Sequence, residues 1–181
     1  TCVPALQQGK RVKMNCPPSC AGSSGGRDFT GQTEGKAETM NLKQAKELVR
    51  GRLSDKRYEH TLNVRKMAVK LAKRYGVDED KAALAALLHD SAKEISKDEM
   101  RAIMQAHPEY AQGGEARPTP VWHGICAAIL ARTEWGVTDE AVLSAIACHT
   151  AGKAGMTQLD KILYLADMTS AERDWPGVDD L

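Results

Sequence analysis

Aromatic residues are scarce in this sequence, which has one Phe, four Tyr and three Trp among 181 residues. A core with few large rings must be built mainly from Ala, Leu, Ile and Val, which suits closely packed helices. The net charge is only +1, so the sequence lacks the positive balance that predicts binding to nucleic acid or to an anionic membrane. A few local cations are still enough to hold an anion the size of a nucleotide.

Long apolar runs are also absent, because no stretch is long enough to span a bilayer or has the form of a signal-peptide core. The five cysteines are an odd number, and Cys126 and Cys148 lie inside apolar helical patterns. Both features favour reduced thiols over a disulfide framework. We therefore expect a cytoplasmic protein whose partners are neither membranes nor nucleic acids.

Residues 1–39 differ in character from the rest of the sequence. They contain a Cys-Pro-Pro-Ser-Cys segment at 16–20 and a Gly/Ser run at 22–26, without apolar periodicity. We interpret them as a disordered leader or a non-native extension, with the natural start at or near Met40. Cys16 and Cys20 do not predict a zinc site, because a structural site needs four ligands and no second pair accompanies them.

From Met40 onward, apolar residues recur at helical spacing and no segment shows strand alternation. Residues with N-cap and C-cap preferences divide this region, and a loop over 108–120 interrupts it. The predicted N-caps include Ser54 or Asp55, Thr138, and Thr157 in a pair with Asp160. The predicted fold class is all-α, a bundle of about six to seven helices. The predicted helices cover about 41–52, 54–75, 78–93, 96–107, 120–136, 138–149 and 157–171.

Four of the five histidines and two aspartates fall in apolar helical surroundings. His60 shares a helical face with Val64, whereas His89 and Asp90 directly follow an apolar run. Taken singly, an inward histidine is more often a hydrogen-bonded core residue than a metal ligand. Six buried ionisable groups are costly unless they neutralise something, and a pair of metal ions does so. The six residues are His60, His89, Asp90, His123, His149 and Asp167.

A carboxylate has two oxygens, so Asp90 is the residue best suited to bridge two metal ions. The other ligands would divide between its two sides, with His60, His89 and Asp167 on one and His123 and His149 on the other. Water that bridges two metals is a strong nucleophile near neutral pH, and both metals can hold phosphoryl oxygens. The pattern therefore predicts a two-metal phosphohydrolase centre.

Three cations are placed to neutralise a polyphosphate beside such a centre. Lys93 follows His89 by four residues, which predicts a shared helical face. Arg57 lies one turn before His60, and Arg173 lies less than two turns beyond Asp167. For Arg173, an ordinary surface ion pair is an equal alternative.

The order His, His-Asp, His, His, Asp resembles the HD-domain superfamily of metal-dependent phosphohydrolases. The sequence around these residues is closer to one branch, the bacterial YqeK family. The motifs that carry the likeness are Arg57-Tyr58-Glu59-His60, His89-Asp90-Ser91-Ala92-Lys93, Trp122-His123-Gly124, Ala145-Ile146-Ala147-Cys148-His149-Thr150, Met156, Leu165-Ala166-Asp167 and Glu172-Arg173.

This resemblance covers residues 40–181 and implies an enzyme, a symmetrical bis(5'-nucleosyl)-tetraphosphatase that converts diadenosine tetraphosphate into two ADP. It implies that all six His and Asp residues are metal ligands, with Asp90 and Lys93 catalytic. It places Arg57, Lys93, Thr150 and Arg173 at the substrate. The cofactors would be two metal ions, commonly Fe, with Mn or another first-row metal as alternatives. A homodimer is implied as well. Family members usually continue beyond residue 181, so we expect the domain at 40–181 to be truncated.

Two other functions are compatible with the sequence. The first is an HD phosphohydrolase for another nucleotide, such as a nucleoside monophosphate or a guanosine second messenger, with the loop over 107–120, which begins with His107 to Tyr110, as a lid. The second is a nucleotide-sensing domain without catalysis. The second function is disfavoured, because such domains often lack a metal ligand or the phosphate-binding lysine, and here the predicted ligands and Lys93 are all present.

Overall fold

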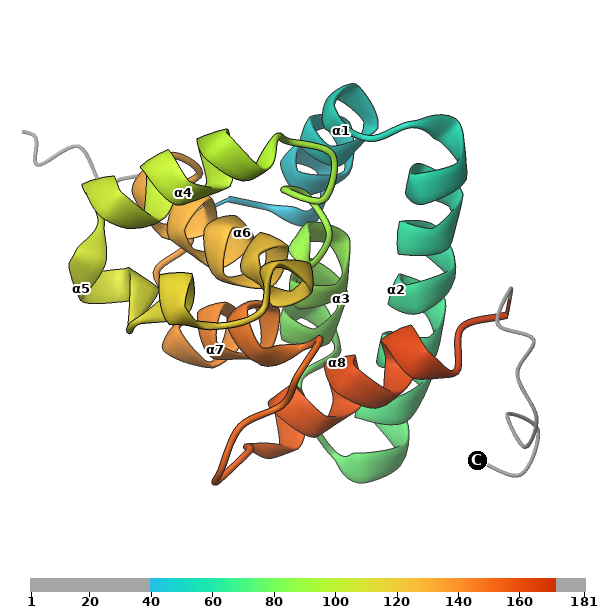
Figure 1. Ribbon diagram of the computed structural model, residues 1–181. Coiled ribbons are helices and arrows are strands. Elements are labelled where there is room, and N and C mark those ends of the chain that lie inside the picture. Colours follow the sequence, from blue (N-terminus) through green and yellow to red (C-terminus); the bar gives the residue numbers. More distant parts are fainter. Residues whose placement is uncertain (1–39, 172–181) are drawn as a thin grey trace, which may run out of the picture. The chain divides into compact units, whose positions relative to one another are not determined.

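The computed structural model describes residues 40–171 (Figure 1). The expectations for residues 1–39, for Arg173 and for the C-terminal end of the chain concern residues outside this part. Within it, the structure has eight α-helices, two short 3-10 helices and no strand, so the all-α prediction is confirmed. The helices are α1 (Leu42–Arg52), α2 (Asp55–Tyr75), α3 (Glu79–Leu88), α4 (Lys97–Ala106), α5 (Pro108–Ala111), α6 (Trp122–Thr133), α7 (Glu140–Cys148) and α8 (Gln158–Met168). Among these described helices, none combines the length and the apolar character needed to cross a membrane.

Side-chain caps define where several helices begin. Thr157 caps α8 in a reciprocal capping box with Asp160, as predicted. The prediction that Thr138 caps the next-to-last helix is wrong by one residue, because Asp139 is the cap. Its Oδ1 accepts from the backbone N–H groups of Ala141 and Val142, at 2.9 and 3.1 Å. The carboxylate of Asp139 also pairs with Lys81 at 2.7 Å, a contact between helices that favours it over the neighbouring threonine.

The end of α3 differs from the prediction, and the difference changes how Lys93 is placed relative to His89. The helix ends at Leu88, not near Lys93, and residues 89–94 form consecutive turns. The hydroxyl of Ser91 donates to the Leu88 carbonyl at 2.7 Å, and the Ser91 N–H reaches the same oxygen at 3.1 Å. These bonds occupy a carbonyl that would otherwise continue the helix. Lys93 therefore does not share a helical face with His89.

The predicted loop over 108–120 also contains more structure than expected. It includes the short helix α5 and two 3-10 helices, Gly114–Ala116 and Thr119–Val121. At the other end of the domain, α8 stops at Met168 and not near Ala171, and both the N–H and the hydroxyl of Thr169 donate to the Leu165 carbonyl.

The core consists mostly of small aliphatic side chains, as the shortage of aromatics predicts. Helix α3 lies between α2 and the α6–α7 pair (Figure 1) and also contacts α1 and α8. Alanines allow these helices to approach closely. The alanines of α2 and α3 that are buried are Ala68, Ala72, Ala82, Ala83, Ala85 and Ala86. The end of α3 is thereby held in the interior, and the residues that follow it start from a buried position.

Candidate metal centre

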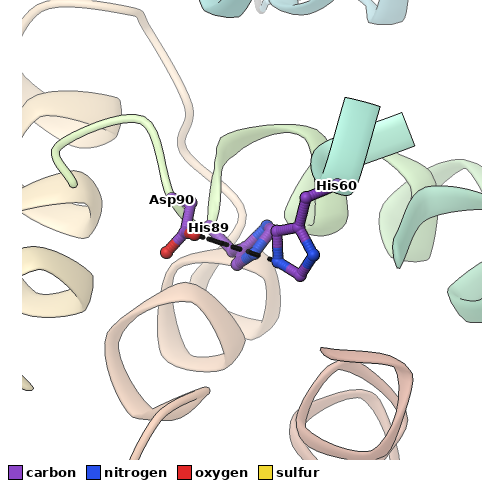
Figure 2. A group of neighbouring side chains, drawn as sticks. All are labelled: His60, His89 and Asp90. Atoms are coloured by element: carbon purple, nitrogen blue, oxygen red, sulfur yellow. Dashed lines mark ion pairs between the residues drawn. The ribbon is translucent and has the colours of Figure 1, made fainter. Parts of the chain in front are cut away.

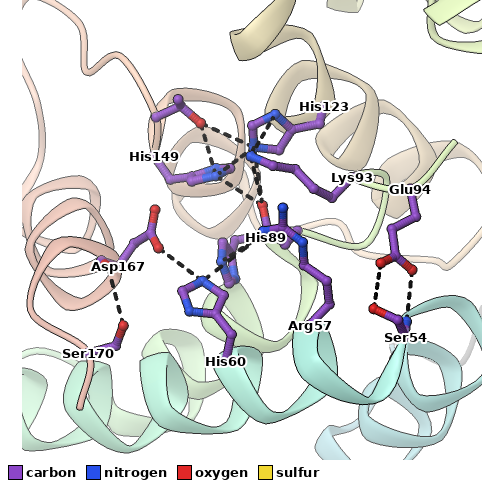
Figure 3. A network of polar contacts seen from close by, with 12 residues as sticks. Ser54, Arg57, His60, His89, Lys93, Glu94, His123, His149, Asp167 and Ser170 are labelled. Carbon is purple, nitrogen blue, oxygen red and sulfur yellow. Dashed lines mark hydrogen bonds and ion pairs between the residues drawn. The ribbon is translucent and has the colours of Figure 1, made fainter. Parts of the chain in front are cut away.

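The six predicted ligand residues meet at one place in the fold (Figure 3). Their ligand atoms form three overlapping groups, each with its atoms within 4.8 Å of one another. The groups are His60, His89 and Asp90; His89, His149 and Asp167; and Asp90, His123 and His149. Helices α2, α6 and α8, the turn after α3 and the C-terminal end of α7 supply them.

The two oxygens of Asp90 face different pairs of histidines. Oδ1 lies 3.1 Å from His123 Nε2 and 3.7 Å from His149 Nε2. Oδ2 lies 3.8 Å from His89 Nε2 and 3.9 Å from His60 Nε2 (Figure 2). The carboxylate is only 4% exposed. One buried carboxylate thus separates two imidazole pairs, which is the arrangement that a ligand bridging two metal ions requires.

His89 and His149 have the same local geometry. Each directly follows a helix, and its Nδ1 bonds a carbonyl three residues back, Ala86 O at 2.6 Å and Ile146 O at 2.8 Å. A carbonyl only accepts, so Nδ1 carries the proton and Nε2 presents a lone pair to the centre. The Nε2 atom of His89 is fully buried without a hydrogen-bond partner. Such an atom is costly in a core, and a metal ion would satisfy it.

The protonation states suit metal binding. Burial lowers the pKa of His89 to about 4, and burial also lowers the pKa of His123. For Asp90, burial alone would raise the pKa, but the interaction with His89, the hydrogen bonds with His123 and His149 and the charge of Lys93 outweigh burial and hold the pKa below its usual range. His89 and His123 are therefore neutral beside a carboxylate anion at neutral pH, and these are the forms that bind metals. Asp167 extends this set, with its Oδ1 3.1 Å from His60 Nε2.

Predicted substrate-binding residues border the centre. Arg57 donates to Asp90 Oδ2 at 3.3 Å, and Lys93 Nζ lies 3.0 Å from His123 Nε2 and 3.7 Å from Asp90 Oδ1. Both cationic side chains are partly exposed. The hydroxyl of Thr150 lies 3.0 Å from His149 Nε2. Lys93 is brought here by the turn after α3, not by the helical face that the sequence predicted.

One contact at the centre was missed by the sequence analysis. Glu94 accepts from the hydroxyl and the N–H of Ser54, at 2.6 and 2.8 Å (Figure 3). Arg52 adds a bond to the Ser91 carbonyl at 3.2 Å. These bonds tie the turn that carries Asp90 to the start of α2 and to the end of α1. They also explain why Ser54 makes no side-chain cap on α2, although its position predicts one.

The buried cysteines take no part in the centre, as predicted. Cys126 and Cys148 are both reduced and buried. Burial raises the pKa of Cys126 to about 12 and that of Cys148 to about 11. A thiolate is the form that binds metals and attacks electrophiles, so both residues serve as small core side chains.

Gly124 marks a close approach of α6 to α7 beside His123. A Cβ at this position would lie 3.0 Å from Ile146 O and 3.1 Å from the His149 ring. We expect Gly124→Ala to lower the free energy of unfolding by about 1–3 kcal/mol, because the helix or the ring must move. Urea unfolding measures this loss, and metal content reports the position of His149.

Gly51→Ala is the matched control for this substitution. Gly51 lies within α1, and an added Cβ would meet no atom within 4 Å. Alanine should leave stability unchanged or raise it by up to about 1 kcal/mol, because it favours a helix. Equal stability of the Gly124→Ala variant and the unsubstituted protein would contradict the close approach.

Comparison with known proteins defines the class to which this fold and site belong. The HD domain family model matches residues 57–172, and the chain belongs to this family. It is 41% identical over 142 residues to "Bis(5'-nucleosyl)-tetraphosphatase, symmetrical" of Bacillus subtilis, covering 78% of this chain and 76% of that protein. The protein of the same description from Staphylococcus aureus is 39% identical over 145 residues, covering 78% and 73%.

A solved structure shows the same fold. It is the crystal structure of a predicted HD superfamily hydrolase involved in NAD metabolism from Clostridium acetobutylicum. The TM-score is 0.67 at 32% sequence identity, covering 78% of this chain and 75% of that one. Together with the curated relatives, this match confirms the resemblance to the HD superfamily and its YqeK branch that the motifs indicate.

Proposed function

We propose that the protein hydrolyses dinucleoside polyphosphates symmetrically, converting diadenosine tetraphosphate and water into two ADP. The observation that carries this proposal is the position of Asp90 between two pairs of histidines, with Arg57 and Lys93 beside it. The names of the relatives from Bacillus subtilis and Staphylococcus aureus point to the same reaction.

The side chains of the centre fit a pair of metal ions. Imidazole and carboxylate are good ligands for first-row metals, and the buried Nε2 of His89 has no other partner. Iron is the metal that we expect, with manganese or another first-row metal as alternatives. When bound, such ions polarise phosphoryl oxygens and lower the pKa of water. The proposed ligands are His60, His89, Asp90, His123, His149 and Asp167.

The remaining polar residues of the centre would bind and orient the phosphate chain. Lys93 lies beside Asp90 Oδ1, whereas Arg57 lies beside Asp90 Oδ2. Cations on both sides of one carboxylate can neutralise neighbouring phosphates as charge builds up in the transition state. The hydroxyl of Thr150 can donate to a phosphate oxygen from a third direction. Cleavage of the bond between the two central phosphates then releases one ADP from each half of the substrate.

The products of diadenosine tetraphosphate hydrolysis test the proposal. With Fe²⁺ or Mn²⁺ supplied, we expect ADP as the only nucleotide product, and in ¹⁸O-water one of the two ADP molecules should carry the label. Formation of ATP and AMP, or no turnover with either metal, would contradict it. A panel with nucleoside monophosphates and guanosine polyphosphates separates this function from that of an HD phosphohydrolase for another nucleotide. Light scattering measures the oligomeric state and so tests the homodimer that the family resemblance implies.

A further inference from the structure

The most deeply buried carboxylate outside the metal centre belongs to Asp160 of α8, which is 0% exposed. Its Oδ1 accepts from Ser144 Oγ at 2.6 Å. Its Oδ2 accepts from the Thr157 N–H at 2.8 Å and lies 3.4 Å from Lys153 Nζ. Lys153 also donates to Ser144 Oγ at 2.5 Å. We refer to these four residues as the Asp160 network.

The contacts of the Asp160 network exceed what a helix cap needs. The capping box of α8 requires only the bond from the Thr157 N–H to Asp160 Oδ2 and its reciprocal bond. Ser144 lies on α7 and Lys153 in the segment between α7 and α8, so the other two contacts reach beyond α8. A buried carboxylate is costly unless it is paired. Burial raises the pKa of Asp160, but its partners outweigh burial and keep the pKa below its usual range.

The segment that the Asp160 network holds, residues 149–157, begins inside the metal centre. His149 is the first residue after α7, and the hydroxyl of Thr150 contacts the Nε2 atoms of both His149 and His123. The segment then turns sharply, with a bond from the Gly152 N–H to the Cys148 carbonyl at 2.7 Å and a φ of +66° at Gly152. A positive φ of this kind favours glycine.

The Asp160 network lies within two helical turns of one ligand candidate at the end of α7, His149, and one on α8, Asp167. Ser144 precedes His149 by five residues on α7, which is about 7.5 Å along a helix. Asp160 precedes Asp167 by seven residues on the same side of α8, which is about 10 Å. Because these distances are short and the helices are stiff, movement at Asp160 changes the separation of His149 and Asp167. These two residues share one of the three ligand groups with His89.

We propose that Asp160 is a positioning residue for the metal centre. Through Ser144 and Lys153 it fixes α7, residues 149–157 and α8 against one another, and it thereby sets where His149, Thr150 and Asp167 lie around Asp90. The inference rests on the metal centre assigned under the proposed function. It adds a role for a buried acid that contacts neither the ligands nor the substrate.

The test compares Asp160→Asn with Asp139→Asn. Asp139, like Asp160, accepts at least one backbone N–H group and pairs with a lysine, but it lies at the other end of α7 from His149. Both variants should be less stable than the unsubstituted protein. Only Asp160→Asn should weaken Mn²⁺ affinity, about tenfold as for residues that orient metal ligands. Only this variant should also speed hydrogen exchange at the Gly152 amide.

Each outcome decides a separate point. Loss of stability in both variants, with unchanged Mn²⁺ affinity and Gly152 exchange in Asp160→Asn, overturns the inference and leaves Asp160 a structural residue. If Asp160→Asn does not fold, Ser144→Ala removes the hydroxyl contacts with Asp160 and Lys153 without altering the capping box. It should also weaken Mn²⁺ affinity and speed hydrogen exchange at the Gly152 amide. If the unsubstituted protein binds no metal, the proposed function fails, and hydrogen exchange at Gly152 still decides whether Asp160 fixes the segment.

Discussion

Replacement of Asp90 by asparagine should lower turnover of diadenosine tetraphosphate at least about a thousandfold and remove most of the metal from the purified protein. Asparagine keeps the size of the side chain but offers one neutral oxygen in place of a charged pair. Because the two oxygens of Asp90 face different histidine pairs, one half of the centre loses its oxygen ligand and the other keeps only a neutral oxygen.

The free energy of unfolding should also fall in the Asp90→Asn variant. The carboxylate lies near the cations of Arg57 and Lys93, and its removal leaves them without their partner inside a partly buried site. Circular dichroism therefore has to accompany the activity and metal measurements. Asp78→Asn is the control, since Asp78 caps the other end of α3 and lies outside the centre. A folded Asp90→Asn protein with normal turnover would refute the metal assignment as a whole.

Replacement of Lys93 by methionine is the second large effect that we expect. Turnover should fall about a hundredfold to a thousandfold, because an ammonium beside the reacting phosphates is lost. Metal content should stay within about twofold of the unsubstituted protein, because Lys93 is not among the proposed ligands. Steady-state kinetics and elemental analysis of the same preparation measure the two quantities.

Two further variants sharpen the Lys93 experiment. Lys97→Met removes a lysine from the exposed first turn of α4 and should leave turnover unchanged. Lys93→Arg keeps the charge with a different shape, so its turnover should lie between that of Lys93→Met and that of the unsubstituted protein. The role assigned to Lys93 would be wrong if Lys93→Met kept turnover within threefold.

The sequence predicted the convergence of the six ligand candidates because each lies in an apolar helical pattern. Burial forces such side chains into one core, where they are costly unless they pair with one another or with a metal ion. The prediction needed no knowledge of how the helices pack. For this reason it succeeded for residues on five separate elements, from His60 on α2 to Asp167 on α8.

Details that depend on contacts between distant residues were not predictable in this way. Ser54 has the position of a helix cap, but Glu94, forty residues later, takes its hydroxyl. Thr138 and Asp139 are both good caps, and the ion pair with Lys81 from another helix favours the second. Propensity and periodicity contain no information about such partners. The early end of α3 is different, because the Ser91 hydroxyl competes with the backbone for the Leu88 carbonyl only three residues away.

The ends of α3 and α7 have a consequence for how the centre attracts ions. Both helices stop directly before a histidine of the centre, so their C-terminal carbonyls, with partial negative charge, lie near it. Helix α6 begins next to His123, and its N-terminus has partial positive charge. The backbone dipoles of two helices thus favour a cation, while the third favours an anion such as phosphate. Because peptide groups produce this field, substitution of a ligand side chain leaves it in place.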